Sequence, residues 1–122
     1  MLSEKYLNLL SFPDVVVKEF YLDVSRKSLQ INCIDGYLET APEGTSIEEV
    51  FIEINQFQSL SIFEYRNDSL TPIFSYSQDF ALKDICEFTY SNDGTSFKGF
   101  SRIRGLWTEF IVNGGVLEVS HR

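Results

Sequence analysis

Short apolar runs with a period of two constrain the fold of this chain more than any other feature. Leu29, Ile31 and Cys33 alternate with polar neighbours, and the same alternation recurs in residues 49–55 and 60–62. Such a pattern places one side of a β-strand in a core and the other in solvent. β-branched and aromatic residues dominate these runs, which favours strands over helices. The sequence therefore predicts a chain built from half-buried strands.

Turn residues separate these runs at short intervals. Residues 25–27 fit a short connection between the first two strands, and a break in the alternation near Glu19 indicates a bulge. Asp35-Gly36 offers a glycine for positive φ and predicts a turn or bulge there. Residues 67–68 and 71–72 mark another turn. Frequent turns with no alternation of strand and helix favour antiparallel sheets.

The C-terminal part of the chain carries a second set of signals. Asn113-Gly114-Gly115 predicts a tight turn that joins residues 106–112 and 116–119 into a terminal hairpin. Residues 79–90 are compatible with a helical turn, with a strand, or with the first followed by the second, and residues 3–10 fit a helical turn. We predict a mainly β fold, an antiparallel β-sandwich or partly open barrel of about 7–9 short strands with at most one or two short helical turns.

Composition is consistent with a single domain over residues 1–122. The chain is 43% hydrophobic and has 11 Phe, six Tyr and one Trp, enough to fill one core. The sequence has no apolar stretch long enough for a membrane span and begins without a signal-peptide layout, so we expect a cytoplasmic protein with no membrane partner. Cys33 and Cys86 are interpreted as reduced core thiols, with a disulfide between them as the alternative.

Residues that could support catalysis or metal binding are scarce. The one histidine, His121, is next to last in the chain, where no orienting partner is fixed, so we predict that the protein is not an enzyme. Two cysteines and one histidine are too few for a structural zinc site, and neither a calcium-loop motif nor a glycine-rich phosphate loop occurs. We expect no metal site and no cofactor. The net charge of −8 argues against nucleic acid as a partner.

Acidic residues are concentrated in the middle of the chain. No lysine or arginine occurs between Lys27 and Arg66, whereas seven Asp and Glu residues do. Such a segment is either a solvated surface or an electrostatic match for a basic partner, with aromatic residues as anchors. Alternation places Glu49, Phe51 and Glu53 on one face. The predicted partner-binding residues are Asp35, Tyr37, Glu39, Glu43, Glu48, Glu49, Phe51 and Glu53.

Two features near the C-terminus are interpreted structurally. Trp107 lies in a strand-like run and is interpreted as a core residue, with an interface anchor as the alternative. Lys98, Arg102 and Arg104 alternate with apolar residues and are interpreted as a solvated face or a counterweight to the acids. Gly99 is expected to mark a bulge or a close backbone approach.

The sequence also resembles the small immunity proteins of bacterial toxin systems, including those paired with contact-dependent inhibition toxins. The resemblance is carried by the acidic, β-rich character together with Leu82-x-x-Ile85-x-Glu87-Phe88, Gly99-Phe100 and Trp107-x-Glu109-Phe110, and it covers about the last 40 residues, with a weaker echo in the first two strands. It implies a protein that binds the basic, often nucleic-acid-cleaving, domain of a cognate toxin by mimicking phosphate charge. No individual functional residue is carried over from it.

We therefore expect an immunity or inhibitor protein that binds and neutralises a basic toxin domain, for example a nuclease, and that is a monomer or a weak dimer when free. The alternative is a β-barrel that binds a small apolar metabolite or lipid, which the aromatic content would suit. A subunit of a larger assembly is the third interpretation.

Overall fold

The structure, a computed structural model, describes residue 2, residues 4–40 and residues 43–122. Over these residues the chain forms eleven strands and two short helical elements. The strands are β1 (Leu10–Ser11), β2 (Val15–Asp23), β3 (Ser28–Leu38), β4 (Thr45–Asn55), β5 (Ser59–Arg66), β6 (Ser69–Ile73), β7 (Asp84–Ile85), β8 (Glu87–Tyr90), β9 (Gly94–Phe100), β10 (Trp107–Asn113) and β11 (Val116–His121). The helical elements are α1 (Glu4–Leu7) and the 3₁₀ turn η1 (Gln78–Phe80).

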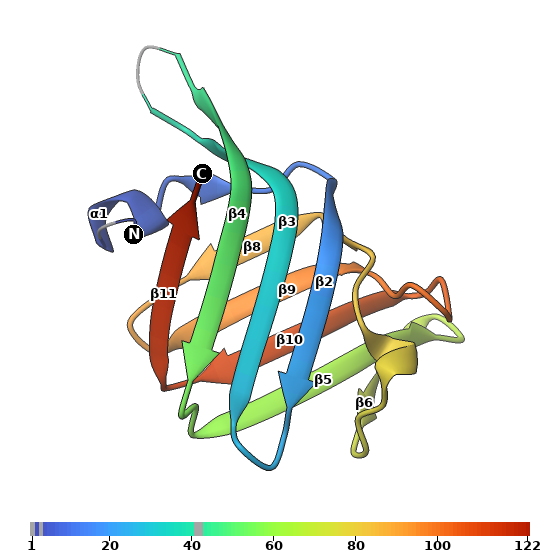
Figure 1. The fold of residues 1–122 in the computed structure, drawn as a ribbon. Coiled ribbons are helices and arrows are strands. Elements are labelled where there is room, and N and C mark those ends of the chain that lie inside the picture. The colour runs from blue at the N-terminus through green and yellow to red at the C-terminus, as the bar shows by residue number, and fades with distance from the viewer. Residues whose placement is uncertain (1, 3, 41–42) are drawn as a thin grey trace.

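Two antiparallel sheets pack face to face. The first has the order β11-β4-β3-β2-β7, with β1 also paired to β3, and the second has the order β6-β5-β10-β9-β8. Strands of the first sheet cross those of the second at a steep angle, so each sheet covers the inner side of the other (Figure 1). The predicted mainly β, antiparallel fold is confirmed. The predicted strand number was too low, because two-residue pieces such as β1 and β7 are too short to show a period.

Alternation along the strands builds the core as the sequence predicted. Leu29 and Ile31 of β3 are fully buried, as are Phe97 of β9 and Phe110 of β10 from the opposite sheet. The rings of Phe20 and Phe110 meet across the interface with centroids 4.9 Å apart. The bulge expected near Glu19 is confirmed by a register shift between Val17 and Glu19. The core therefore lies between the two sheets and leaves their outer faces free for other roles.

The hairpin of β3 and β4 is longer than the sequence indicated. No turn forms at Gly36, because β3 runs unbroken and pairs Gly36 with Ile47 of β4. A Cβ atom at Gly36 would lie 2.8 Å from Cγ2 of Val50, so packing rather than a turn requires the glycine. The far end of the hairpin extends beyond the body of the sandwich (Figure 1). The acidic loop expected over residues 40–46 includes Ala41 and Pro42, which lie outside the described residues, while Thr45 and Ser46 belong to β4.

The predicted terminal hairpin is wrong. Strand β10 pairs with β5 on one side and β9 on the other, so neither edge is free for β11. Gly114 and Gly115, with φ of 74° and 88°, instead carry the chain across to the first sheet, where β11 pairs with β4. The turn expected at Thr71-Pro72 is also wrong, because both residues lie in the edge strand β6, where proline is tolerated.

Residues 79–90 join the two sheets at one corner. They divide into the end of η1, strand β7 and strand β8. The strand predicted there is confirmed, whereas the helical turn predicted from Leu82, Ile85 and Phe88 is wrong, because Leu82 bridges to Ser101 and the other two residues lie in β7 and β8. The Lys83 amide donates to the Phe100 carbonyl at 2.9 Å, and the Lys83 carbonyl accepts from the Val17 amide at 2.9 Å. A Cβ atom at Gly99 would lie 2.2 Å from the Asp84 carbonyl oxygen, which confirms the close approach predicted there. Neither helical element of the described residues is long and apolar enough to cross a bilayer.

Candidate functional site

The outer face of the first sheet carries a group of acidic side chains. Glu118 of β11 lies directly across from Glu53 of β4, and Asp35 of β3 lies directly across from Glu48 of β4. Within the described part of the chain none of these four carboxylates forms an ion pair with a lysine or arginine. We call the outer surface formed by Asp35, Glu48, Glu53 and Glu118 the acidic face.

A shallow depression of about 300 Å³ lies within the acidic face. Two cross-strand pairs line it. One is Glu53 with Glu118, and the other is Phe51 with Ser120. Phe51 is 40% exposed, which is high for a phenylalanine in the middle of a sheet. The depression therefore combines an aromatic surface with two carboxylates that accept hydrogen bonds. Its lining is completed by Gln30, Asn32 and Ile52.

The predicted binding residues divide between the acidic face and its surroundings. Phe51 and Glu53 share one face of β4, as the alternation predicted, and Asp35 and Glu48 are exposed nearby. Glu39 follows β3 and Glu43 precedes β4, so both lie at the end of the β3–β4 hairpin that extends beyond the sandwich. Tyr37 is half-buried. Its hydroxyl lies 1.7 Å from the position that a Cβ atom at Gly44 would occupy, so its ring packs against Gly44 across the hairpin. Whether these residues bind a partner stays a prediction.

Glu49 differs from its acidic neighbours because the protein's own cations neutralise it. Its carboxylate lies 3.2 Å from Nε of Arg122 and 4.0 Å from Nζ of Lys18. The residue also has φ of 42°, in the left-handed region, so the regular strand geometry is interrupted there. Glu49 therefore contributes less negative charge to the acidic face than the sequence suggested.

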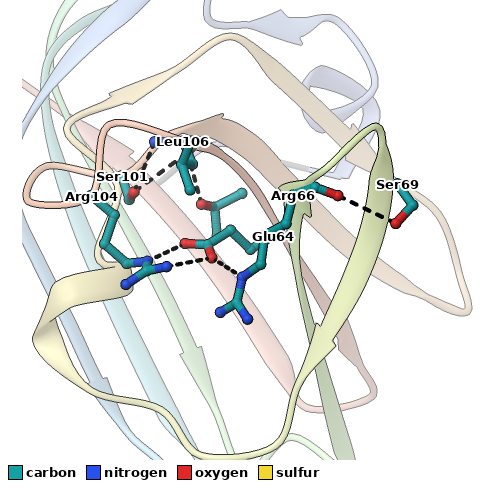
Figure 2. A network of polar contacts seen from close by, with 7 residues as sticks. Glu64, Arg66, Ser69, Ser101, Arg104 and Leu106 are labelled. Atoms are coloured by element: carbon teal, nitrogen blue, oxygen red, sulfur yellow. Dashed lines mark hydrogen bonds and ion pairs between the residues drawn. The ribbon is translucent and has the colours of Figure 1, made fainter.

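Glu64, the seventh acid of the segment, belongs to the other sheet and is fully buried. Arg104 donates from Nε and Nη2 to its two carboxylate oxygens, the second bond being 2.9 Å long, and Nε of Arg66 also donates to it (Figure 2). Burial alone raises the pKa of Glu64, but the two arginines outweigh that effect and hold the pKa below its ordinary value. Arg104 also lies over the ring of Phe80, 5.3 Å from its centroid. This cluster stabilises one end of the sandwich and is separate from the acidic face.

Comparison with known proteins finds no matching family model, no matching curated protein and no matching solved structure. The site is therefore interpreted from its own geometry.

Glu118 is a residue of the acidic face that the sequence analysis missed. It lies between Leu117 and Val119, at an exposed position of β11. The expected hairpin with residues 106–112 would have placed it beside the second sheet. Only the pairing of β11 with β4 brings Glu118 next to Glu53. The exposure of Glu118 was predictable from alternation, whereas its neighbour was not.

The outer face of the second sheet has a different character. Tyr65, Leu70 and Phe100 are 45%, 46% and 40% exposed. Trp107 is half-buried on this face, where its ring meets Phe100 edge-on at 5.4 Å and its indole nitrogen donates to Glu109 at 3.0 Å. The interpretation of Trp107 as a core residue is therefore wrong. Lys98 lies 3.7 Å from Glu109 and 3.9 Å from Glu87, which agrees with its predicted role as a counterweight to acids.

The two cysteines lack the low pKa of a reactive thiol. Cys33 and Cys86 are free thiols. Burial, followed by the charge of Asp35, raises the pKa of Cys33 to about 12, and burial, followed by a hydrogen bond with Asp14, raises the pKa of Cys86 to about 12. Both are protonated at neutral pH and are poor nucleophiles. No group of three or more His, Cys, Asp and Glu side chains in the described residues could hold a metal ion.

Proposed function

We propose that this chain is an immunity or inhibitor protein that binds and neutralises a basic toxin domain through the acidic face. The observation that carries the proposal is the presence of two like-charged cross-strand pairs, Asp35 with Glu48 and Glu53 with Glu118. Like charges directly opposite each other destabilise a sheet, and oppositely charged or neutral pairs would suit an ordinary surface better. A cationic partner removes this repulsion when it binds.

The composition of the acidic face suits recognition of arginine and lysine side chains. Carboxylates of Glu53 and Glu118 accept hydrogen bonds from guanidinium and ammonium groups, and the exposed ring of Phe51 offers apolar contact and a cation–π surface beside them. The net charge of −8 attracts a basic protein over a distance and accelerates the encounter. The proposed partner is therefore a protein surface rich in arginine and lysine.

The cytoplasm is the compartment that fits this role. Cys33 and Cys86 are free, as expected for a protein that works in a reducing environment. An inhibitor made beside its toxin in the same cell meets the toxin there.

The first test measures protection of growing cells. The partner to be used is the product of the neighbouring reading frame, produced with and without this chain. The test variant carries Glu48→Gln, Glu53→Gln and Glu118→Gln, which remove three charges and keep side-chain size. The matched control carries Asp68→Asn, Asp79→Asn and Asp93→Asn, which remove three exposed charges elsewhere. We expect the wild type and the control to restore growth and the test variant to fail.

Stability provides the second readout and requires no partner. Relief of the two like-charged pairs should raise the free energy of unfolding of the test variant by about 0.2–1 kcal/mol per pair, measured by urea unfolding. Loss of protection by a protein that is more stable than the wild type separates binding from folding. A neighbouring product that is not toxic, or a test variant that protects fully, contradicts the proposal.

The alternative function, an apolar-ligand carrier, receives less support. An apolar groove of about 220 Å³ lies beside Phe57 and Ile62. Pockets for small molecules usually measure roughly 300–1,000 Å³, so this groove is small for such a ligand.

A further inference from the structure

Two strands of the first sheet carry the same pattern of side chains, an aromatic residue between two acids at alternate positions. The pattern is Glu19, Tyr21 and Asp23 in β2, and Glu49, Phe51 and Glu53 in β4. Both rings lie on the outer face of the sheet, where Tyr21 is 57% exposed and Phe51 is 40% exposed. Strand β3 separates the two patterns. The outer face therefore repeats one local arrangement on two strands.

The acid at one end of each pattern is neutralised within the protein. Asp23 lies 3.8 Å from Nε of Arg26, and Glu49 has the two ion pairs described above. The acid at the other end is Glu19 in β2 and Glu53 in β4. Neither forms an ion pair with a lysine or arginine of the described residues. Each ring thus keeps one uncompensated carboxylate beside it.

Side-chain amides hold these two carboxylates in place. Nδ2 of Asn32 donates to Oε2 of Glu19 at 3.1 Å, and Nδ2 of Asn55 donates to Oε1 of Glu53 at 2.6 Å. Among the described residues no group donates to the second oxygen of either carboxylate. A carboxylate that is already oriented loses less conformational freedom when it pairs with an incoming group. Both patterns therefore present a fixed acceptor next to an exposed ring.

Each ring also lines a depression in the outer face. Phe51 lines the depression of about 300 Å³, Tyr21 lines another of about 440 Å³, and Gln30 belongs to both. Tyr21 pairs with Gln30, and Phe51 pairs with the next outward residue of β3, Asn32. Strands lie about 4.8 Å apart and alternate residues of one strand roughly 6.7 Å apart, so the Cα atoms of Tyr21 and Phe51 are roughly 12 Å apart.

An arginine side chain suits a ring and a carboxylate arranged in this way. A planar guanidinium group stacks on an aromatic face while its N–H groups donate sideways to a carboxylate. A lysine ammonium group is a compact and strongly hydrated charge, so it gains less from the ring. The charge of Arg26 at the edge of the second depression is offset by Asp23, and it leaves Glu19 uncompensated.

We propose that the outer face of the first sheet holds two arginine subsites, Phe51 with Glu53 and Tyr21 with Glu19, and that the basic partner presents two arginines roughly 12 Å apart. This inference rests on the proposed function and extends the contact surface from the acidic face to β2. The other carboxylates of the acidic face accelerate the encounter. The two rings slow dissociation, because aromatic anchors act mainly on the lifetime of a complex.

Dissociation of the complex tests the two rings. The partner is the toxic product of the neighbouring reading frame, and the dissociation rate constant is measured by surface plasmon resonance. Tyr21→Ala and Phe51→Ala should each raise it by at least about tenfold, whereas Tyr21→Phe, which keeps the ring, should dissociate like the wild type. Tyr65→Ala is the matched control, since Tyr65 is 45% exposed on the other sheet, and it should change nothing. Circular dichroism checks that each variant folds.

Replacement of arginines in the partner tests the assignment of the subsites. Each arginine of the neighbouring product is replaced by lysine in turn and measured against the wild type, Tyr21→Ala and Phe51→Ala. One arginine should lose its effect when Tyr21 is absent, and a different arginine should lose its effect when Phe51 is absent. Coupling of both rings to the same arginine, or of either ring to none, overturns the proposal.

The outcomes separate this inference from the proposed function. An unchanged dissociation rate constant for Tyr21→Ala overturns the second subsite, while the inhibitor function stands if the variant with Glu48→Gln, Glu53→Gln and Glu118→Gln still fails to protect cells. Full protection by that variant contradicts the function itself. A neighbouring product that does not bind the wild type contradicts both.

Discussion

Glu64 is counted among the acids of the segment between Lys27 and Arg66 but has a structural role in the fold. Its carboxylate is fully buried, and the two arginines that neutralise it come from the end of β5 and from the loop after β9. A buried carboxylate without partners is strongly unfavourable, so the buried position of Glu64 depends on the two arginines. Arg104 lies 40 positions away in the chain, a separation over which sequence alone does not reveal a contact.

Replacement of Glu64 tests this cluster. Glu64→Gln should lower the free energy of unfolding at pH 7 by about 1–3 kcal/mol, because the buried side chain loses its charge-assisted hydrogen bonds with two arginines. Urea unfolding measures the change. Glu87→Gln, which removes an exposed carboxylate 3.9 Å from Lys98, should change stability by less than about 1 kcal/mol.

The pH dependence of the same variant follows from the direction of the pKa shift. The pKa of Glu64 is held below its ordinary value of 4.5 in the folded protein. Its contribution to stability is therefore complete above pH 4.5 and is lost as the pH falls through the folded-state pKa. The difference between wild type and Glu64→Gln should narrow in acid. An equal difference at pH 7 and pH 3 would contradict this role for the carboxylate.

The sequence did contain part of the information on Glu64. Ile62 and Glu64 are two positions apart in β5, so alternation places them on the same side, and Ile62 is a core residue. Glu64 was counted among the acids of the segment between Lys27 and Arg66, and the side of the strand on which it lies was not predicted. Alternation did place Phe51 and Glu53 together on the outer side of β4.

At the scale of elements, local sequence patterns predicted the positions of the strands better than they predicted which strands pair with each other. The turns at residues 25–27 and 67–68 connect neighbouring strands of one sheet, and each was predicted as a turn from its residues. Residues 113–115 have equally good turn residues but connect different sheets. A turn signal shows where the chain reverses, and the free edges of the sheets decide which strand becomes the neighbour.

The corner between β7 and β9 provides a test at this scale. Gly99→Ala should lower the free energy of unfolding by about 1–3 kcal/mol, because the new methyl group meets the Asp84 carbonyl oxygen at 2.2 Å and forces the two strands apart. Gly105→Asn is the control, since nothing lies within 4 Å of a Cβ atom there and asparagine tolerates the φ of 67°. Equal stability of Gly99→Ala and the wild type in urea would show that the corner is loosely packed.

At the scale of the whole molecule, the two outer faces of the sandwich differ in chemistry. The first sheet presents the acidic face, and the second presents exposed aromatic and aliphatic side chains around Tyr65 and Phe100. Composition predicted the negative charge but not its division between the sheets, because that division depends on strand order. Glu118 joins Glu53 only through the pairing of the last strand with β4.

The most direct measurement of the central claim is the association rate constant with the toxic product of the neighbouring reading frame, followed by stopped-flow fluorescence across a series of salt concentrations. The account predicts a rate constant that falls steeply with salt for the wild type and for the control with Asp68→Asn, Asp79→Asn and Asp93→Asn. The variant with Glu48→Gln, Glu53→Gln and Glu118→Gln should associate about tenfold more slowly at low salt, with a flatter dependence. Equal low-salt rate constants for that variant and the control would contradict the account.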